Sequence, residues 1–306
     1  MRVLVTGEKG FIAKNLPKSF EKVGGLVVDT AESPLIRIDS GEICVHRNST
    51  EAWADLFQNL GVDVVVHNAA KVGTDVVALD HTESTLTNVD GTYNIPVCYM
   101  GTTVIYDTPR YQSSAITEES VQSPNTLYGA LKQAGETIIK SQAKNWLIVR
   151  PLFAYGGVGD MNSLMAKTFY SHLKRRSSVD MFLDPRKKKD YLHVEDFCDA
   201  VAVACSGGHW QDDFNIAAET PLSVGEIVEL MSSACGHDLS YMIKWHPATD
   251  YLGNHILSSA KFRNIAGWEP RLSLREGVVA SWRSILANAH NHEYNPLRYL
   301  DEAEDK

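Results

Sequence analysis

A tyrosine and a lysine stand four residues apart in the segment YGALK, as Tyr128 and Lys132. On a helix, this spacing puts both side chains on one face. An ammonium beside a phenol stabilises the phenolate and lowers the pKa of the phenol from its usual value of about 10. The pair therefore predicts acid or base chemistry at a hydroxyl. The alternative is a chance spacing on a solvated helix face.

A glycine loop near the N-terminus predicts a phosphate site. The segment GEKGFIA runs from Gly7 to Ala13, between an apolar strand and a helix pattern. The first glycine permits a tight turn, and Gly10 lets the backbone approach a pyrophosphate. The helix N-terminus then offers free amides to the anion. The alternative is a glycine turn between two packed elements.

The expected second strand ends in an acid, Asp29, which stands 19 residues after Gly10. An acid at about this distance hydrogen-bonds the ribose hydroxyls of NAD and repels a 2′-phosphate. Lys9 points the other way, because a cation in the loop can pair with that phosphate. The pattern favours NAD and leaves NADP open, and Asp29 could also be a plain turn residue.

Apolar runs alternate with helix patterns along the chain. The expected strands are 2–5, 26–29, 62–67, 94–99, 146–150 and 213–217. The expected helices are 15–23, 53–60, 128–142, 194–205, 224–235, 261–265 and 274–286. Such alternation predicts an α/β fold with a parallel sheet covered on both faces. The second half has fewer strands, which favours a smaller lobe over the sheet.

Composition removes several classes of protein. With 44% hydrophobic and 22% charged residues, the 306-residue chain is globular. A balance of 29 basic against 38 acidic residues gives a net charge of −9, so we expect no nucleic acid and no membrane as partners. The five cysteines are scattered without a C-x-x-C pair, which argues against disulfides and zinc. We therefore expect a cytoplasmic protein without a metal site.

Eight ordered segments resemble those of the extended short-chain dehydrogenase/reductases, in the NAD-dependent epimerase/dehydratase family that modifies nucleotide sugars. The segments are TGEKGFIA (6–13), DVVVHNAA (63–70), NVDGTYN (88–94), GTTVIY (101–106), SPNTLYGALK (123–132), VRPLFAYG (149–156), KDYLHVEDF (189–197), and FNIA (214–217) with SSAKFRNIAGWEP (258–270).

The resemblance implies a Rossmann-type doubly wound sheet with a smaller C-terminal α/β substrate lobe. Residues 1–155 would form the NAD-binding domain, with later segments around 185–205 returning to it. Residues 156–290 would mainly bind a nucleoside diphosphate sugar, and 291–306 would be a disordered polar tail. A homodimer would form through the helices that contain Asn88 and Tyr128.

The resemblance also implies residue roles. Tyr128 would be the acid and base at a sugar hydroxyl, assisted by Lys132, Thr102 and Thr103. Cofactor contacts would come from Gly7, Lys9, Gly10, Phe11, Ile12, Asp29, Asn68, Ala69, Ala70, Tyr128 and Lys132. Substrate contacts would come from Lys71, Phe153 and Lys189.

Three departures from the family pattern bear on the reaction. Phe153 replaces an asparagine that touches the substrate phosphates, which makes the pocket more apolar. Arg47 stands where an aliphatic residue usually holds the adenine, so a 2′-phosphate partner stays open. Thr103 and Val104 follow Thr102 where sugar 4,6-dehydratases carry Asp-Glu, and elimination without that acid and base is hard to arrange.

The leading hypothesis is an NAD-dependent nucleotide-sugar epimerase that works through a transient 4-keto sugar, with Tyr128 as acid and base. The second is an NAD(P)H-dependent 4-keto nucleotide-sugar reductase that uses the same residues. The third is a nucleotide-binding scaffold without catalysis, because a fold does not by itself define a function.

Overall fold

The computed structural model of this protein describes residues 1–7, 10–27, 37–39, 42–44, 61–68, 95–107, 114–157, 160, 163–175, 178–246 and 253–288. The expected helix 53–60 and the tail 291–306 lie outside the described residues.

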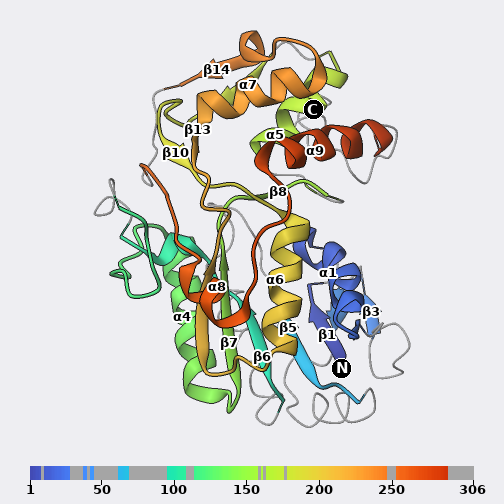
Figure 1. Cartoon of the computed structure of the whole chain (residues 1–306), viewed down its shortest axis with the longest axis vertical. Helices are drawn as coiled ribbons and strands as arrows, with labels where there is room; N and C mark the ends of the chain where they lie inside the picture. The colour runs from blue at the N-terminus through green and yellow to red at the C-terminus, as the bar shows by residue number, and fades with distance from the viewer. Residues whose placement is uncertain are drawn as a thin grey trace.

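A six-stranded parallel sheet forms the centre of the larger lobe (Figure 1). In the order β12-β7-β6-β5-β1-β2, its strands are Asp212–Ile216, Trp146–Pro151, Val97–Met100, Val64–His67, Arg2–Thr6 and Leu26–Val27. Every neighbouring pair is parallel. The chain moves outward from β1 in both directions, first to β2 and then through β5. This is the doubly wound order, and it confirms the predicted fold class.

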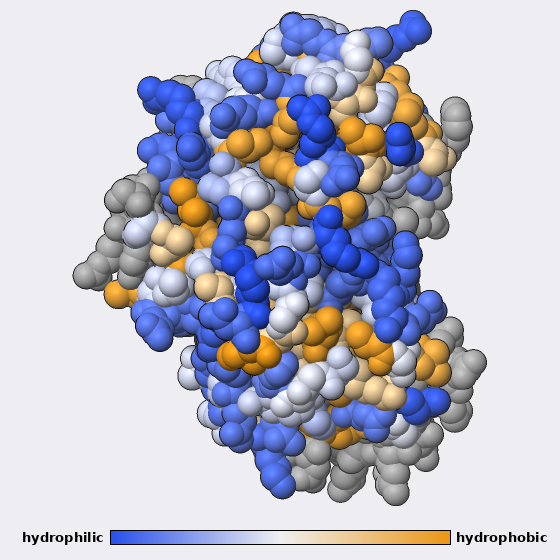
Figure 2. Space-filling model, viewed as in Figure 1, coloured by the Kyte–Doolittle hydropathy of each residue, from blue (hydrophilic) through white to orange (hydrophobic). Residues whose placement is uncertain are grey.

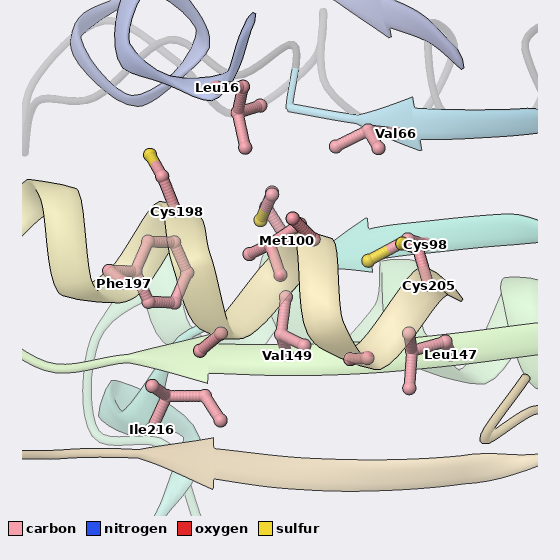
Figure 3. Close-up of a cluster of buried hydrophobic side chains, with 14 of the residues drawn as sticks. Leu16, Val66, Cys98, Met100, Leu147, Val149, Phe197, Cys198, Cys205 and Ile216 are labelled. Carbon is pink, nitrogen blue, oxygen red and sulfur yellow. The ribbon is translucent and has the colours of Figure 1, made fainter. Parts of the chain in front are cut away.

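Helices cover both faces of the sheet, which explains the apolar runs in its strands β1, β5 and β6. On one face, α1 (Phe11–Lys22) and α6 (Val194–Ser206) pack on Cys98, Met100 and Val149 (Figure 3). On the other face, α4 (Leu127–Gln142) packs through Ile139 on Val97, Tyr99 and Ile148. Successive residues of β6 therefore enter different cores, as the alternation of strand side chains requires.

The second lobe has its own core, which is built on three helices. They are α5 (Leu164–Leu173), α7 (Val224–Cys235) and α9 (Leu274–Asn288). Met165 and Phe169 of α5 pack there with Ile227 and Met231 of α7. Ser163 and Ser223 cap α5 and α7, and Gly236 ends α7 in the left-handed conformation, with φ of 74°.

Four short strand pairs lie outside the main sheet among the described residues. They are β8 (Ala154–Tyr155) with β11 (Leu192–His193), β9 (Val179–Met181) with β14 (Ile243–Trp245), β10 (Lys188–Lys189) with β13 (Leu222–Ser223), and β3 (Arg37–Asp39) with β4 (Glu42–Cys44). The remaining elements are α8 (Ala260–Ala266) and the 3-10 helices η2 (Thr103–Ile105) and η4 (Ser240–Met242).

Several details go beyond the expected elements. The helix α5 and the short strand pairs were not among the expected elements, and they are additions to them. The strand β12 returns to the main sheet, with α8 packed against it. The division of the chain near residue 155 stays a prediction.

No helix in the described part of the chain is long and apolar enough to span a membrane. The surface face in Figure 2 is mostly hydrophilic, with small separate apolar patches.

Candidate functional site

The glycine loop closes against the end of β5. Gly7 has a φ of 73°, and its carbonyl accepts a 2.8 Å hydrogen bond from the Gly10 amide. A Cβ atom at Gly10 would lie 3.0 Å from the Gly7 carbonyl oxygen and 3.1 Å from Asn68 Nδ2. A side chain at position 10 would therefore crowd this turn. The structure brings together three of the predicted cofactor residues at the carboxyl ends of β1 and β5.

The helix α1 begins directly after this turn. Gly10 is its N-cap and has no side chain with which to cap the amides of the first turn. Phe11 and Ile12 pack their half-buried side chains against the core, while their amides head the helix. Free amides and the positive end of the helix dipole suit a phosphate. These residues fit the pyrophosphate of a dinucleotide.

Five predicted site residues lie outside the described residues. Lys9 and Asp29 belong to the predicted phosphate and ribose contacts. Ala69, Ala70 and Lys71 follow Asn68 in the predicted cofactor and substrate contacts. The roles of all five stay predictions, and so does the effect of Arg47 on the adenine site.

The helix α4 positions the tyrosine and the lysine. Thr126 caps it by accepting a 3.0 Å hydrogen bond from the Gly129 amide. A Cβ atom at Gly129 would lie 2.8 Å from the Val104 carbonyl oxygen, so the glycine lets the helix approach η2 closely. Tyr128 is half-buried and Lys132 is buried, on the same face of α4.

Lys132 is only 5% exposed. Its Nζ donates a 2.8 Å hydrogen bond to the Met100 carbonyl and lies 5.0 Å from the centre of the Tyr99 ring. Burial lowers the pKa of Lys132 to about 8, and the charge of Glu136 acts in the opposite direction. This lysine therefore changes charge close to physiological pH.

The two threonines use their hydroxyls differently. Thr102 Oγ1 accepts from the Val104 amide at 3.3 Å and caps η2. Thr103, which is 1% exposed, donates its hydroxyl hydrogen to the Pro151 carbonyl at 3.4 Å. In the capping bond Thr102 only accepts, so its hydroxyl hydrogen is not used there. Thr102 is therefore the better candidate to orient a substrate hydroxyl.

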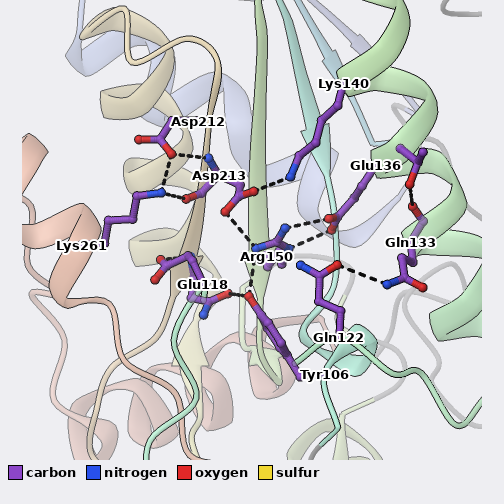
Figure 4. A network of polar contacts seen from close by, with 12 residues as sticks. Tyr106, Glu118, Gln122, Gln133, Glu136, Lys140, Arg150, Asp212, Asp213 and Lys261 are labelled. Carbon is purple, nitrogen blue, oxygen red and sulfur yellow. Dashed lines mark hydrogen bonds and ion pairs between the residues drawn. The ribbon is translucent and has the colours of Figure 1, made fainter. Parts of the chain in front are cut away.

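A buried network behind α4 holds these elements together (Figure 4). The fully buried guanidinium of Arg150 donates to both oxygens of Glu136, at 2.9 and 2.7 Å. It also donates to the Tyr106 hydroxyl at 2.9 Å and to Asp213 Oδ1 at 3.2 Å. The network joins α4, β7 and β12 to the residue that follows η2. Sequence reasoning did not single it out, although Glu136 lies one helical turn after Lys132.

Two predicted substrate residues meet beside the second lobe. Lys189 Nζ lies 5.8 Å from the centre of the Phe153 ring and donates to the Gly253 carbonyl at 2.6 Å. The ring of His255 stands edge-on to Phe153, with the ring centres 6.1 Å apart. Burial, and then Lys189, lower the pKa of His255 to about 3, so its imidazole is neutral.

Sequence reasoning missed His255, because an isolated histidine in a loop has no motif. Its side chain is fully buried, and neither ring nitrogen has a hydrogen-bond partner among the described residues. Buried polar atoms normally have one.

The sequence model of the NAD dependent epimerase/dehydratase family matches residues 3–217. The chain belongs to this family. The match confirms the predicted family, the enzyme class of the extended short-chain dehydrogenase/reductases and the cofactor, NAD. It includes all six strands of the parallel sheet, apart from Arg2 of β1, as well as the glycine loop and α4.

Members of this family resemble the chain over nearly its full length. A dTDP-glucose 4,6-dehydratase from Streptomyces niveus is 25% identical, covering 99% of this chain and 97% of the relative. A UDP-glucose 4-epimerase from Halalkalibacterium halodurans is also 25% identical and covers both chains completely.

Solved structures show the same fold. The UDP-glucose 4-epimerase of Thermotoga maritima, solved with UDP-glucose, superposes with a TM-score of 0.76 at 20% identity, covering 94% of this chain and 99% of its own. The dTDP-glucose 4,6-dehydratase of Bacillus anthracis, solved with NAD, gives 0.78 at 19% identity, covering 96% and 98%.

Proposed function

We propose that the protein is an NAD-dependent nucleotide-sugar epimerase that acts through a transient 4-keto sugar. The observation that carries this proposal is the surroundings of Lys132. Its buried ammonium has a pKa of about 8 and shares a helix face with Tyr128, just beyond the carboxyl end of β6. Ligands of doubly wound sheets bind at this edge.

Each side chain has a distinct part in the proposed reaction. The charge of Lys132 stabilises the phenolate of Tyr128, which lets the phenol exchange a proton near neutral pH. Tyr128 removes the proton from the sugar 4-hydroxyl and later returns it. Thr102 donates a hydrogen bond to the same hydroxyl and orients it. NAD supplies the hydride acceptor and donor when it is bound.

Dehydration is less compatible with the residues after Thr102. Loss of water from the sugar needs an acid and a base near the carbon that loses its hydroxyl. Thr103 and Val104 carry no ionisable group at physiological pH, and the hydroxyl of Thr103 is directed to Pro151. We therefore favour epimerisation, although several relatives are dehydratases.

The first experiment tests cofactor and reaction together. Freshly purified protein is denatured, and the released small molecules are identified by mass spectrometry. The native protein is then incubated with UDP-glucose and, separately, with dTDP-glucose, and the sugar is analysed by NMR. Released NAD and a 4-epimer as product support the proposal. NADPH-dependent reduction of a 4-keto sugar instead favours the reductase, and a 6-deoxy-4-keto product identifies a dehydratase.

A matched pair of variants tests the role of Tyr128. Tyr128→Phe should lower turnover by about 10²–10⁴-fold, the usual contribution of a general acid or base. Tyr241→Phe makes the same chemical change at a tyrosine that is 69% exposed in η4, and it should retain activity. Equal activity of the two variants would refute the assigned role of Tyr128.

Two further features belong to the proposal. We infer a nucleoside diphosphate sugar as substrate, with Phe153 and Lys189 beside it. We also infer a cytoplasmic homodimer. Light scattering of the purified protein can test whether the assembly is a dimer.

A further inference from the structure

We infer that Tyr99 is a positioning residue for Lys132, because its aromatic face holds the buried ammonium and keeps it charged. This inference rests on the proposed function for its link to catalysis, but the contact itself can be tested without turnover. Tyr99 lies on β6, one residue before the Met100 carbonyl that accepts from Lys132.

The environment of the ammonium leaves a role for an aromatic face. Lys132 is 5% exposed, and its Nζ makes one hydrogen bond among the described residues, to Met100. An ammonium has three N–H donors, so one acceptor does not replace its hydration. Nζ lies 5.0 Å from the centre of the Tyr99 ring, within the range of a cation–π contact. Such contacts are strongest where water is excluded.

The ring of Tyr99 is itself firmly held. Tyr99 is 2% exposed, and its hydroxyl lies under Gly135 of α4, where a Cβ atom would collide with it. On the neighbouring strand, His67 stacks on Tyr99, with ring centres 5.7 Å apart and planes 25° from parallel. His67 Nδ1 and Thr6 Oγ1 share a 2.8 Å hydrogen bond. The strands β1, β5 and β6 together fix the position of the aromatic face.

Other charged and titratable groups also surround Lys132. Glu136 on α4 raises the pKa of Lys132, but both of its oxygens are occupied by Arg150 of β7. Tyr128 lies on the same face of α4, and His67 of β5 stacks on the Tyr99 ring. Burial raises the pKa of Tyr99, with smaller effects from Glu136 and Tyr128, so its hydroxyl remains neutral. A neutral ring can act on the cation only through its π face and dipole.

The test separates the ring face from the hydroxyl. Tyr99→Phe keeps the face, whereas Tyr99→Leu removes it. The protonation of Lys132 is followed by NMR of lysine labelled with ¹³C at Cε, and the Lys132 signal is identified by its absence in Lys132→Arg. We expect a pKa near 8 in the native chain and in Tyr99→Phe. In Tyr99→Leu we expect it to fall by about one unit, the size of a desolvated cation–π contact.

Isosteric replacements cover the case in which Tyr99→Leu does not fold. Phenylalanine with increasing ring fluorination at position 99 retains the size of the side chain and weakens the negative face. The pKa of Lys132 should fall stepwise along this series. An unchanged pKa across the series, or an equal fall in Tyr99→Phe and Tyr99→Leu, would overturn the inference.

Turnover provides a second, separate measurement. With UDP-glucose as the probe, the alkaline limb of the pH–activity profile should move down by about one unit in Tyr99→Leu, because Lys132 would lose its charge at lower pH. A purely structural role would lower activity at all pH values without moving that limb. If UDP-glucose is not turned over at all, the proposed substrate is wrong, while the NMR titration still decides the role of Tyr99.

Discussion

Replacing Glu136 by glutamine should strongly destabilise the protein. Glu136 is 3% exposed, and both its oxygens accept from the fully buried Arg150. Removing one partner of such a pair leaves an uncompensated buried charge and typically costs about 3–5 kcal/mol. Glutamine keeps one accepting oxygen, and Asp213 remains 3.2 Å from Arg150. We therefore expect a loss of about 3 kcal/mol, at the lower end of that range.

The loss is measured as the free energy of unfolding by urea, extrapolated to water. In a thermal scan, about 3 kcal/mol corresponds to a fall in Tm of about 5 °C for 306 residues, because the entropy of unfolding is about 2.1 cal/mol/K per residue. Glu229→Gln on α7 is the matched control, because Glu229 is exposed and makes no ion pair within the described chain. A surface substitution of this kind should change stability by less than about 0.5 kcal/mol.

The reasoning has a clear point of failure. If Glu136→Gln and Glu229→Gln have the same stability, the Arg150 pair does not hold α4 on the sheet. A double variant with Arg150→Met separates charge from packing. The double variant contains no unpaired cation. Its loss in unfolding free energy should therefore be smaller than the sum of the losses in the two single variants, and strict additivity would also contradict the pairing.

Three further predictions concern the loop, the helix contact and pH. Gly10→Ala should weaken NAD binding by about tenfold (about 1.4 kcal/mol) in calorimetry, because the methyl would crowd the Gly7 carbonyl and Asn68. Unchanged affinity would contradict a role of the glycine loop in binding the pyrophosphate. Gly135→Ala should cost about 1–3 kcal/mol in urea unfolding, and less in a Tyr99→Phe background, which lacks the hydroxyl that meets the methyl. Burial raises the pKa of Asp190 to about 6, so the folded state binds the Asp190 proton more tightly than the unfolded state does. The stability contributed by the protonated carboxyl is therefore full below about pH 4. It falls by roughly 3 kcal/mol as the pH rises towards 6. The unfolding free energy of Asp190→Asn relative to the native chain should rise across that interval, and a constant difference would contradict the assignment.

Local patterns in the sequence were sufficient for the main elements of the fold. The predicted helix 224–235 coincides with α7 (Val224–Cys235), and the predicted 128–142 differs from α4 by one residue. Such elements are readable because buried side chains recur with the period of the helix or fill a strand completely. The glycine loop and the Tyr128–Lys132 pair could also be recognised in the sequence, because turn and helix geometry depend on only a few neighbouring residues.

The prediction from the sequence missed several elements of the fold. The helix α5 (Leu164–Leu173) was not predicted, and neither were two-residue strands such as β10 (Lys188–Lys189). A strand of this length is defined by its partner rather than by its own pattern, since two residues show no period.

Only the tertiary structure decided which distant residues meet. The pairing of Arg150 with Asp213 joins residues 63 positions apart, and it depends on β12 lying beside β7 in the sheet. The placement of the Lys132 ammonium over Tyr99 depends on how closely α4 approaches β6, which Gly135 permits. Strand order and helix approach are set by packing across the whole core, and no short segment encodes them. The sequence by itself therefore determined the family, the glycine loop and the spacing of Tyr128 and Lys132, whereas the structure decided which buried groups surround that pair.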